Sequence, residues 1–496
     1  MMTFPKLFTK LGVAGLLGLG LLSTTSCNKE FIDLNDPTRI PTTEGYTDSL
    51  SILNGVTAAY AGLQDVYGKS GSNNGLFVFA EVPSDNSTSV ISGQNINEFD
   101  FFTVTSTNLR LQSQWTVTYR TIARCNVVLN RAPAVKLTAA IRNRYYAEVR
   151  FVRALSYFNA VQIWGDVPLV TSEIATIPNA YQFGRTAAAQ VYAQIEEDLR
   201  FAADNLPVTQ TTANLGRATK GAAQGLLGKV YLTQKKYPEA AAVLKQVIDA
   251  NTYALQASYA NVFSITNEMN NEILFAVRYS KGGLGVGSPF ANYFAVTPAL
   301  VGNVGTSDQF NTIHPDLVAA FTASGTADTR AAASYGSTPL GGQTVYYTKK
   351  YADTPTSSLD AENDWIVLRY ADVLLLYAEA LNEQGTTAQA VPFVNRVRTR
   401  AGVPSLATTL SQADLRLAIE NERRLELNME GQRWFDLVRT GRAIPVMNAF
   451  FARYNIRPNN GTTGAAIQIQ AYQLLQPVPI QEIQTNPILT QNPGYN

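Results

Sequence analysis

Acidic and arginine side chains gather in residues 420–442, the stretch of this chain that most resembles a catalytic cluster. Paired carboxylates can act as acid and base in glycoside hydrolysis. Here, however, Glu422 and Glu426 are spaced for one helix face, as are Arg423 and Glu430 over two turns. Buried Arg and Glu persist only when they are paired. We therefore interpret the cluster as an ion-pair network that holds the last helices on the scaffold, and we expect Glu422→Ala to destabilise the fold.

Other catalytic arrangements have little support. His314 is the only histidine, so a multi-histidine metal site cannot form, and a serine triad would depend on this one residue. His314 precedes Pro315, which predicts a turn. The glycine-rich run 282–287 lacks the Lys-Ser/Thr pair and the following helix of a phosphate loop. We expect no enzymatic activity, no metal and no cofactor.

The first cysteine follows a secretory signal. Lys6 and Lys10 precede a short apolar run, residues 11–22, which is too short to span a bilayer. Small polar residues come next, and then Cys27. The pattern predicts a lipoprotein signal over residues 1–26, with Cys27 lipidated and anchored in a membrane by its acyl chains. Ordinary cleavage that leaves a free Cys27 is the alternative.

Composition excludes some classes of partner. Removal of residues 1–26 takes Lys6 and Lys10 from 39 basic residues, which leaves 37 against 38 acidic ones. Because nucleic-acid binding usually requires a basic surface, we expect no nucleic-acid partner. With Cys27 lipidated, Cys125 has no partner for an intramolecular disulfide, and we expect it to be a small buried side chain.

Helical periodicity dominates the first half of the chain. It predicts helices over residues 50–67, 115–131, 142–164 and 187–205. Residues 221–251 then read as helix, turn and helix, with small residues at Gly228 and Ala240 that let the helices approach. Ala378 and Ala390 repeat this spacing, which is the tetratricopeptide pattern. Such pairs must stack to bury their apolar faces, so the sequence predicts a mostly α fold with a tetratricopeptide-repeat scaffold.

Residues 253–360 are rich in Gly, Ser, Thr, Asn and aromatics, and we expect loops, short strands and short helices there. The proline-rich tail, residues 472–496, should wrap the surface in extended form. The predicted organisation is a signal over 1–26, a lipidated tether over 27–48, an N-terminal helical region over 49–252, and a C-terminal region with inserted loops over 253–496.

Two loop regions, residues 73–110 and 279–311, mix aromatics with amides. Sugar capture needs flat rings for C–H faces and amides for hydroxyls. The candidate ligand contacts are Phe77, Phe79, Asn95, Asn97, Phe99, Phe101, Tyr279, Tyr293 and Phe294. Core packing is the alternative for each ring. Neither region contains Trp, which favours Tyr or Phe platforms or a peptide ligand.

Four segments, taken together, resemble the SusD/RagB family of surface lipoproteins from Bacteroidota. They are CNKEFIDLNDP at Cys27, AEVRFVRALSYFNAVQIWGDVPLV (147–170), LRYADVLLLYAEALNEQG (368–385), and ENERRLELNMEGQRWFDLVRTGR (420–442) followed by PVPIQEIQTNPILTQNPGYN at the C-terminus. Their order and spacing extend the resemblance over essentially the whole mature chain.

The resemblance implies a helical scaffold that carries an irregular, loop-rich ligand-binding region. It also implies an outer-membrane lipoprotein that faces the cell exterior, captures an oligosaccharide and delivers it to a TonB-dependent, SusC-like transporter. A peptide-binding lid of the same type is the first alternative. A surface glycosidase and a structural tetratricopeptide adaptor are the others. No ligand contact transfers residue by residue, because the family's contacts follow no motif.

Overall fold

The computed structural model describes residues 45–68, 75–89, 95–458 and 461–495. The predicted signal 1–26, the lipidation site Cys27 and residues 28–44 of the tether lie outside these ranges. From residue 48 onward the chain forms one compact unit. No helix in the described ranges is long and apolar enough to cross a membrane.

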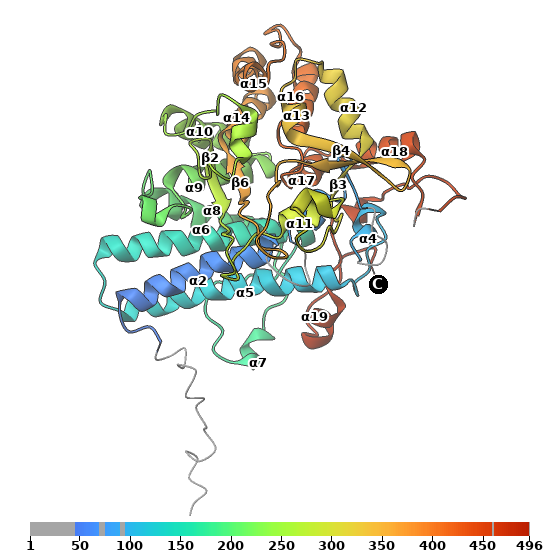
Figure 1. Ribbon diagram of the computed structural model, residues 1–496. Helices are drawn as coiled ribbons and strands as arrows, with labels where there is room; N and C mark the ends of the chain where they lie inside the picture. The colour runs from blue at the N-terminus through green and yellow to red at the C-terminus, as the bar shows by residue number, and fades with distance from the viewer. Residues whose placement is uncertain (1–44, 69–74, 90–94, 459–460, 496) are drawn as a thin grey trace, which may run out of the picture. The chain divides into compact units, whose positions relative to one another are not determined.

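Four long helices form the N-terminal half of this unit, and α2, α5 and α6 lie side by side in Figure 1. Their bounds are α2 Ser49–Tyr67, α5 Leu109–Arg131, α6 Ala139–Trp164 and α8 Ala188–Asn205. Two of them, α5 and α6, begin several residues earlier than periodicity predicts, because polar side chains cap them. Asn108 Oδ1 accepts from the amides of Arg110 and Leu111, and Thr138 accepts from Ile141.

The two predicted repeats are helix pairs. They are α9 Lys220–Thr233 with α10 Tyr237–Asp249, and α14 Tyr370–Glu383 with α15 Thr387–Ala401, followed by α16 Gln412–Glu426. Helix α10 packs against α14, which joins the two pairs. A Cβ on Gly228 would lie 2.4 Å from Leu244 Cγ, so this crossing requires glycine. The mostly α fold is confirmed.

Residues 253–360 contain short strands and helices, as expected. One antiparallel sheet has the order β1-β3-β5-β4, and a second pairs β2 with β6. The bounds are β1 Ser87–Thr88, β2 Ile273–Val277, β3 Thr312–Ile313, β4 Tyr335–Leu340, β5 Gln343–Thr348 and β6 Trp365–Arg369. Leu340 pairs with Gln343 across Gly341 and Gly342, whose φ angles of 58° and 77° suit a type I′ turn.

Short helices complete the fold. They are α3 Phe77–Ala80, α4 Asn97–Asp100, α7 Ile177–Ala180, α11 Phe290–Phe294, α12 Pro315–Ser324, α13 Arg330–Ser334, α17 Arg433–Arg439, α18 Ala443–Tyr454 and α19 Ile480–Thr485. Short 3₁₀ turns cover Ala132–Ala134, Thr212–Asn214, Tyr259–Phe263, Pro298–Val301 and Ala471–Leu474.

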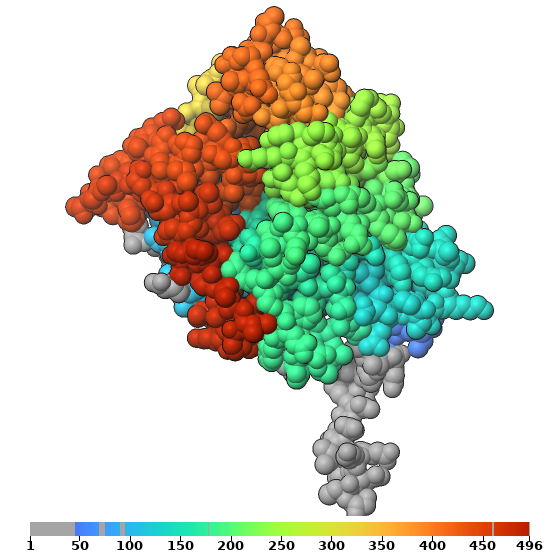
Figure 2. All heavy atoms as spheres, turned by 180° about the vertical axis from the view of Figure 1, so that it is seen from behind, coloured from blue at the N-terminus to red at the C-terminus, as the bar shows by residue number. Residues whose placement is uncertain are grey.

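The C-terminal tail follows the surface of the N-terminal half, and in Figure 2 its dark red atoms lie beside green ones. Asn486 Nδ2 donates to the Phe183 carbonyl, and the Gln476 amide donates to Ile163. The prediction of a wholly extended tail is wrong at α19. Pro479 sits at the N-cap of that helix, where a missing N–H costs nothing, and six residues then fit before the next proline.

Candidate ligand-binding site

The seven predicted aromatic contacts are core residues. Phe77, Phe79, Phe99, Phe101, Tyr279, Tyr293 and Phe294 are each at most 8% exposed. A ring buried to this degree has no free face for a sugar. Phe77 packs edge-to-face against Phe294 with centroids 4.9 Å apart, and Phe79 packs in the same way against Phe99. The first of these contacts joins the two loop regions, so the alternative of core packing describes these rings.

The two predicted amides are half-buried. Asn95 has a φ of 61°, and its Nδ2 donates to Glu98 Oε1 over 2.6 Å at the start of α4. Its carbonyl accepts from Asn108 Nδ2. Asn97 begins α4. The Asn95 side chain thus holds the local turn, and a role of either amide in ligand binding stays a prediction.

A hollow of about 430 Å³ lies between α2, β2 and the segment before α9. We name it the α2–β2 hollow. It is lined by Thr57, Tyr60, Ala61, Leu63, Gln64, Leu215, Gly216, Arg217, Phe275, Ala276, Val277, Arg278, Tyr279, Ser280 and Val286. Small-molecule pockets typically measure about 300–1,000 Å³. Of the predicted contacts, Tyr279 belongs to this lining.

Aromatic and basic groups meet at one wall of the hollow. Tyr60 is half-buried and tilts 40° against Phe275, with centroids 6.4 Å apart. The Arg217 guanidinium lies 5.6 Å from the Tyr60 ring centroid. Arg217 Nη1 also donates to Glu148 over 2.8 Å and Nη2 to Thr57 over 2.9 Å. These bonds fix a cation beside an aromatic ring, which suits a ligand with both C–H faces and hydroxyls.

An acceptor in this hollow lacks a partner. Gln64 Nε2 donates to the Arg278 carbonyl over 2.7 Å, but its Oε1 is buried with no hydrogen bond among the described residues. A buried acceptor without a donor costs free energy, and this oxygen has no surface exposed to the hollow. Gly216 shapes the same wall, because a Cβ there would lie 2.4 Å from Arg278 Cγ.

Two acidic side chains, Glu268 and Asp364, contact the Arg278 guanidinium. Arg278 Nη2 lies 3.1 Å from Glu268 Oε2, and Nη1 lies 3.0 Å from Asp364 Oδ2. Burial raises the pKa of Glu268 to about 8, and the charge of Asp364 adds to this effect. Burial also raises the pKa of Asp364 to about 7, although Arg278 opposes it. The Arg278 guanidinium thus contacts two carboxyl groups, those of Glu268 and Asp364, which retain protons near neutral pH.

These raised pKa values predict a loss of stability as the pH rises. The ordinary pKa values are 4.5 for Glu268 and 3.8 for Asp364. Between about pH 4 and pH 8 the folded protein therefore holds protons that the unfolded chain has released, and the free energy of unfolding falls with increasing pH. We expect Glu268→Gln to reduce this fall, measured by urea unfolding at pH 5.5 and 8.5. An equal fall in both proteins would contradict the assignment.

The glycine-rich loop borders the hollow at Val286 and is not a phosphate cradle. The amides of Gly282 and Gly283 both donate to Asp360 Oδ2 over 3.0 Å. The φ angle of Gly283 is 77°, which favours glycine. Because both N–H groups already donate to the Asp360 carboxylate, they are not available to bind a phosphate.

Residues 420–442 form the predicted ion-pair network. Glu422 and Glu426 share one helix face and both contact Arg330 Nη1, at 2.5 and 3.2 Å. Neither glutamate is exposed. The predicted relation of Arg423 to Glu430 is wrong, because α16 ends at Glu426 and the chain turns before Glu430. Arg423 instead contacts Asp372 and Asp436, at 2.6 and 2.9 Å.

The buried part of the network is balanced in charge. Its members are Arg330, Lys350, Arg369, Arg398 and Arg400, with Glu272, Asp328, Glu422, Glu426 and Glu430. Burial alone would raise the pKa of Glu426, but Arg400, Arg369 and Arg330 hold it well below its usual range. The basic and acidic side chains of the network therefore neutralise one another, and the network supports the fold.

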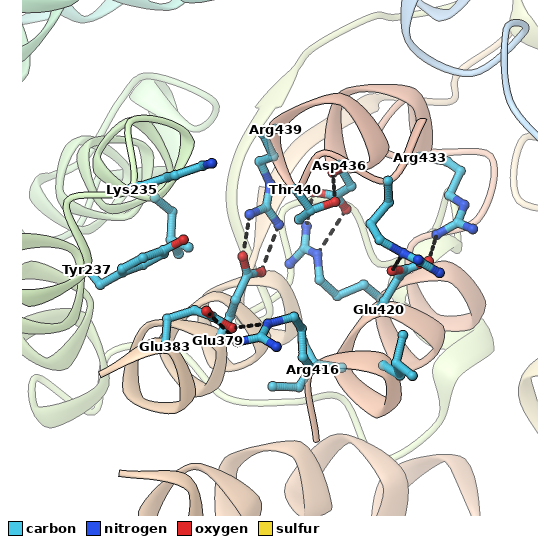
Figure 3. A pocket seen from close by; sticks show the side chains of 15 residues that line it. Lys235, Tyr237, Glu379, Glu383, Arg416, Glu420, Arg433, Asp436, Arg439 and Thr440 are labelled. Carbon is cyan, nitrogen blue, oxygen red and sulfur yellow. Dashed lines mark hydrogen bonds and ion pairs between the residues drawn. The ribbon is translucent and has the colours of Figure 1, made fainter. Parts of the chain in front are cut away.

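A second hollow, of about 220 Å³, lies beside this network between α14, α16, α17 and the α9–α10 turn (Figure 3). Its charges pair across the space. Arg439 Nη2 donates to Glu379 over 2.8 Å, and Arg416 donates to Glu383 through two nitrogens. These pairs make the hollow a weaker candidate for a neutral ligand than the α2–β2 hollow.

Sequence reasoning missed most of the α2–β2 hollow. Tyr60, Gln64 and Arg217 lie on or before helices that read as scaffold, far from the loop regions. One indication of this site was present in the sequence: Gly216 and Arg217, a glycine and a cation, stand immediately before the first repeat. The prediction that His314 lies in a turn is wrong, because His314 is the N-cap of α12, where its Nδ1 accepts from the Asp316 amide.

Comparison with known proteins relates most of the chain to one group. A model described as "SusD family" matches residues 316–495, and one described as "Starch-binding associating with outer membrane" matches residues 30–232. SusD-like protein P25 of Formosa agariphila is 27% identical over 96% of this chain and 97% of its own length.

Solved structures of SusD-like proteins are also similar to this chain. A laminarin-binding SusD-like protein is 28% identical, with a TM-score of 0.76 over 91% of this chain and all of the other. A SusD homologue from Bacteroides thetaiotaomicron has a TM-score of 0.80 over 93% of this chain and all of its own, at 24% identity, and shows the likeness of fold.

Proposed function

The chain belongs to the SusD/RagB family of Bacteroidota, and from this we propose that it is a glycan-binding protein of the outer membrane. Its role is to hold an oligosaccharide in the α2–β2 hollow without breaking a bond. The observation that carries the proposal is the likeness to a laminarin-binding relative over 91% of this chain.

The geometry of the hollow supports a carbohydrate. Tyr60 gives a half-buried ring and Arg217 a fixed guanidinium. A sugar has C–H faces for the ring and hydroxyls that both donate and accept. The volume of about 430 Å³ is in the range of small-molecule pockets.

Two further parts of the proposal concern the envelope. Cys27 carries the lipid anchor, and the glycan passes to a TonB-dependent, SusC-like transporter. The match to a family described as associating with the outer membrane supports this location.

Replacing Cys27 with Ser should release the chain from the membrane fraction. Deleting the chain should slow uptake of the bound glycan at low concentration, with normal uptake restored by the wild-type gene.

Glycan binding is tested by electrophoresis of the purified protein through gels that contain laminarin, starch or other neutral polysaccharides. We expect one polysaccharide to retard the protein, with no release of reducing ends on incubation. Reducing-end release would indicate a glycosidase. Retention of peptides with no glycan binding would indicate a peptide-binding lid.

A further inference from the structure

A groove of about 350 Å³ separates α16 from α18, away from the α2–β2 hollow. We name it the α16–α18 groove. It is lined by Asp85, Asp316, Leu417, Glu420, Asn421, Arg424, Arg433, Arg442, Pro445, Val446, Ala449, Phe450 and Arg453. It shares Leu417, Glu420, Arg433 and Arg442 with the hollow of Figure 3, where Glu420 and Arg433 point toward each other.

The charged residues of the groove form an alternating chain of ion pairs. Its order is Arg453, Asp316, Arg424, Asp85, Arg433, Glu420 and Arg442. Each carboxylate lies between two arginines. Asp316, for example, is 2.8 Å from Arg453 Nη1 and 2.7 Å from Arg424 Nη2. Four arginines therefore share three carboxylates, and both ends of the chain are cations.

The surplus positive charge lies at the exposed ends. The Arg453 side chain is 64% exposed and that of Arg442 is 39% exposed. Arg442 Nε donates to Glu420 over 3.0 Å, while its Nη1 and Nη2 have no protein partner among the described residues. Burial would raise the pKa of Asp85, yet Arg424 and Arg433 hold it well below its usual range. The arginines inside the groove thus stabilise negatively charged groups near them.

The two terminal arginines are aligned along one helix face. Arg442 precedes α18 and Arg453 lies in its last turn, eleven residues later. At 1.5 Å per residue their backbones are about 16 Å apart. Val446 and Ala449 lie between them and line the groove, and Leu417 on α16 is 51% exposed on its opposite side. The groove thus offers some apolar surface, from Val446, Ala449 and Leu417, beside its ion pairs and between a cation at each end.

We propose that the α16–α18 groove binds an anionic oligosaccharide, with carboxylate or sulfate groups at Arg442 and Arg453. Guanidinium groups form strong paired bonds with such anions. Both walls are helices whose backbone groups are already bonded, so an extended peptide would find few partners, whereas sugar rings can pack against the apolar side chains of Val446 and Ala449. The sugar part rests on the proposed function, but the contacts to the anions do not depend on the α2–β2 hollow.

The test is calorimetric titration of the purified full-length protein in detergent with trigalacturonate, a sulfated galactan tetrasaccharide and neutral laminarihexaose. We expect Arg442→Gln and Arg453→Gln each to weaken binding of at least one anionic sugar about tenfold, and added salt to do the same. Neutral sugar binding should not change. Glu420→Gln should strengthen anionic binding, because it frees Arg442.

Arg416→Gln is the matched control, since Arg416 is an exposed arginine of α16 outside the groove. Urea unfolding checks that every variant is folded. Equal affinity in all variants, no binding of either anionic sugar, or preferential binding of an acidic peptide would each overturn the proposal. Loss of neutral sugar binding alone would concern the proposed function and not this groove.

Discussion

Glu426→Gln is expected to lower the free energy of unfolding by about 3–5 kcal/mol. Glu426 is fully buried and contacts Arg330, Arg369 and Arg400. Glutamine keeps the size of the side chain, so no cavity forms. It removes the negative charge, which leaves three buried guanidinium groups with too few counter-charges. Urea unfolding monitored by tryptophan fluorescence measures the change.

Glu383→Gln provides the control for this prediction. Glu383 also pairs with an arginine through two bonds, but the partner, Arg416, is 44% exposed. Exposed ion pairs contribute at most about 1 kcal/mol. If both variants unfold at the wild-type urea concentration, the buried network does not stabilise the fold in the way described.

Ala61→Trp is expected to weaken glycan binding at least about tenfold, or about 1.4 kcal/mol. Ala61 is an exposed residue of α2 that lines the α2–β2 hollow, so an indole at this position occupies space that the ligand needs. Stability should change little, because the side chain points to solvent. Calorimetric titration with the polysaccharide fragment that binds the wild type measures the effect.

Ala58→Trp is the matched control, because Ala58 is exposed on the same helix and does not line the hollow. Both substitutions carry the same cost in helix propensity, below about 0.7 kcal/mol. If Ala61→Trp binds as well as Ala58→Trp, the glycan lies elsewhere on the molecule.

The scaffold could be predicted because it depends on local patterns. Gly228 and Ala240 sit where two helices of a repeat cross, and the crossing leaves no room for a Cβ at Gly228. The position of Glu422 and Glu426 on one helix face, where both contact Arg330, followed from their spacing. Helix starts were less accurate, since Asn108 and Thr138 cap their helices from outside the apolar pattern.

The site could not be predicted, because distant segments build it. Residues 57–64, 215–217 and 275–286 meet at the α2–β2 hollow only after folding. The aromatic loops suggested surface platforms, but Phe77 and Phe294 pack edge-to-face in the core. Composition cannot distinguish a ring that binds a ligand from a ring that joins two loops. The missing partner of Gln64 Oε1 likewise depends on three-dimensional contacts.

Hydrogen–deuterium exchange with and without a neutral oligosaccharide that the protein binds is the most direct test of the α2–β2 hollow as the glycan site. We expect slower exchange at residues 215–217, 278–280 and 286, which line the hollow outside regular helices, and unchanged exchange around Asn95 and Asn97. Protection confined to the Asn95–Asn97 region, or to the α16–α18 groove, would contradict this account.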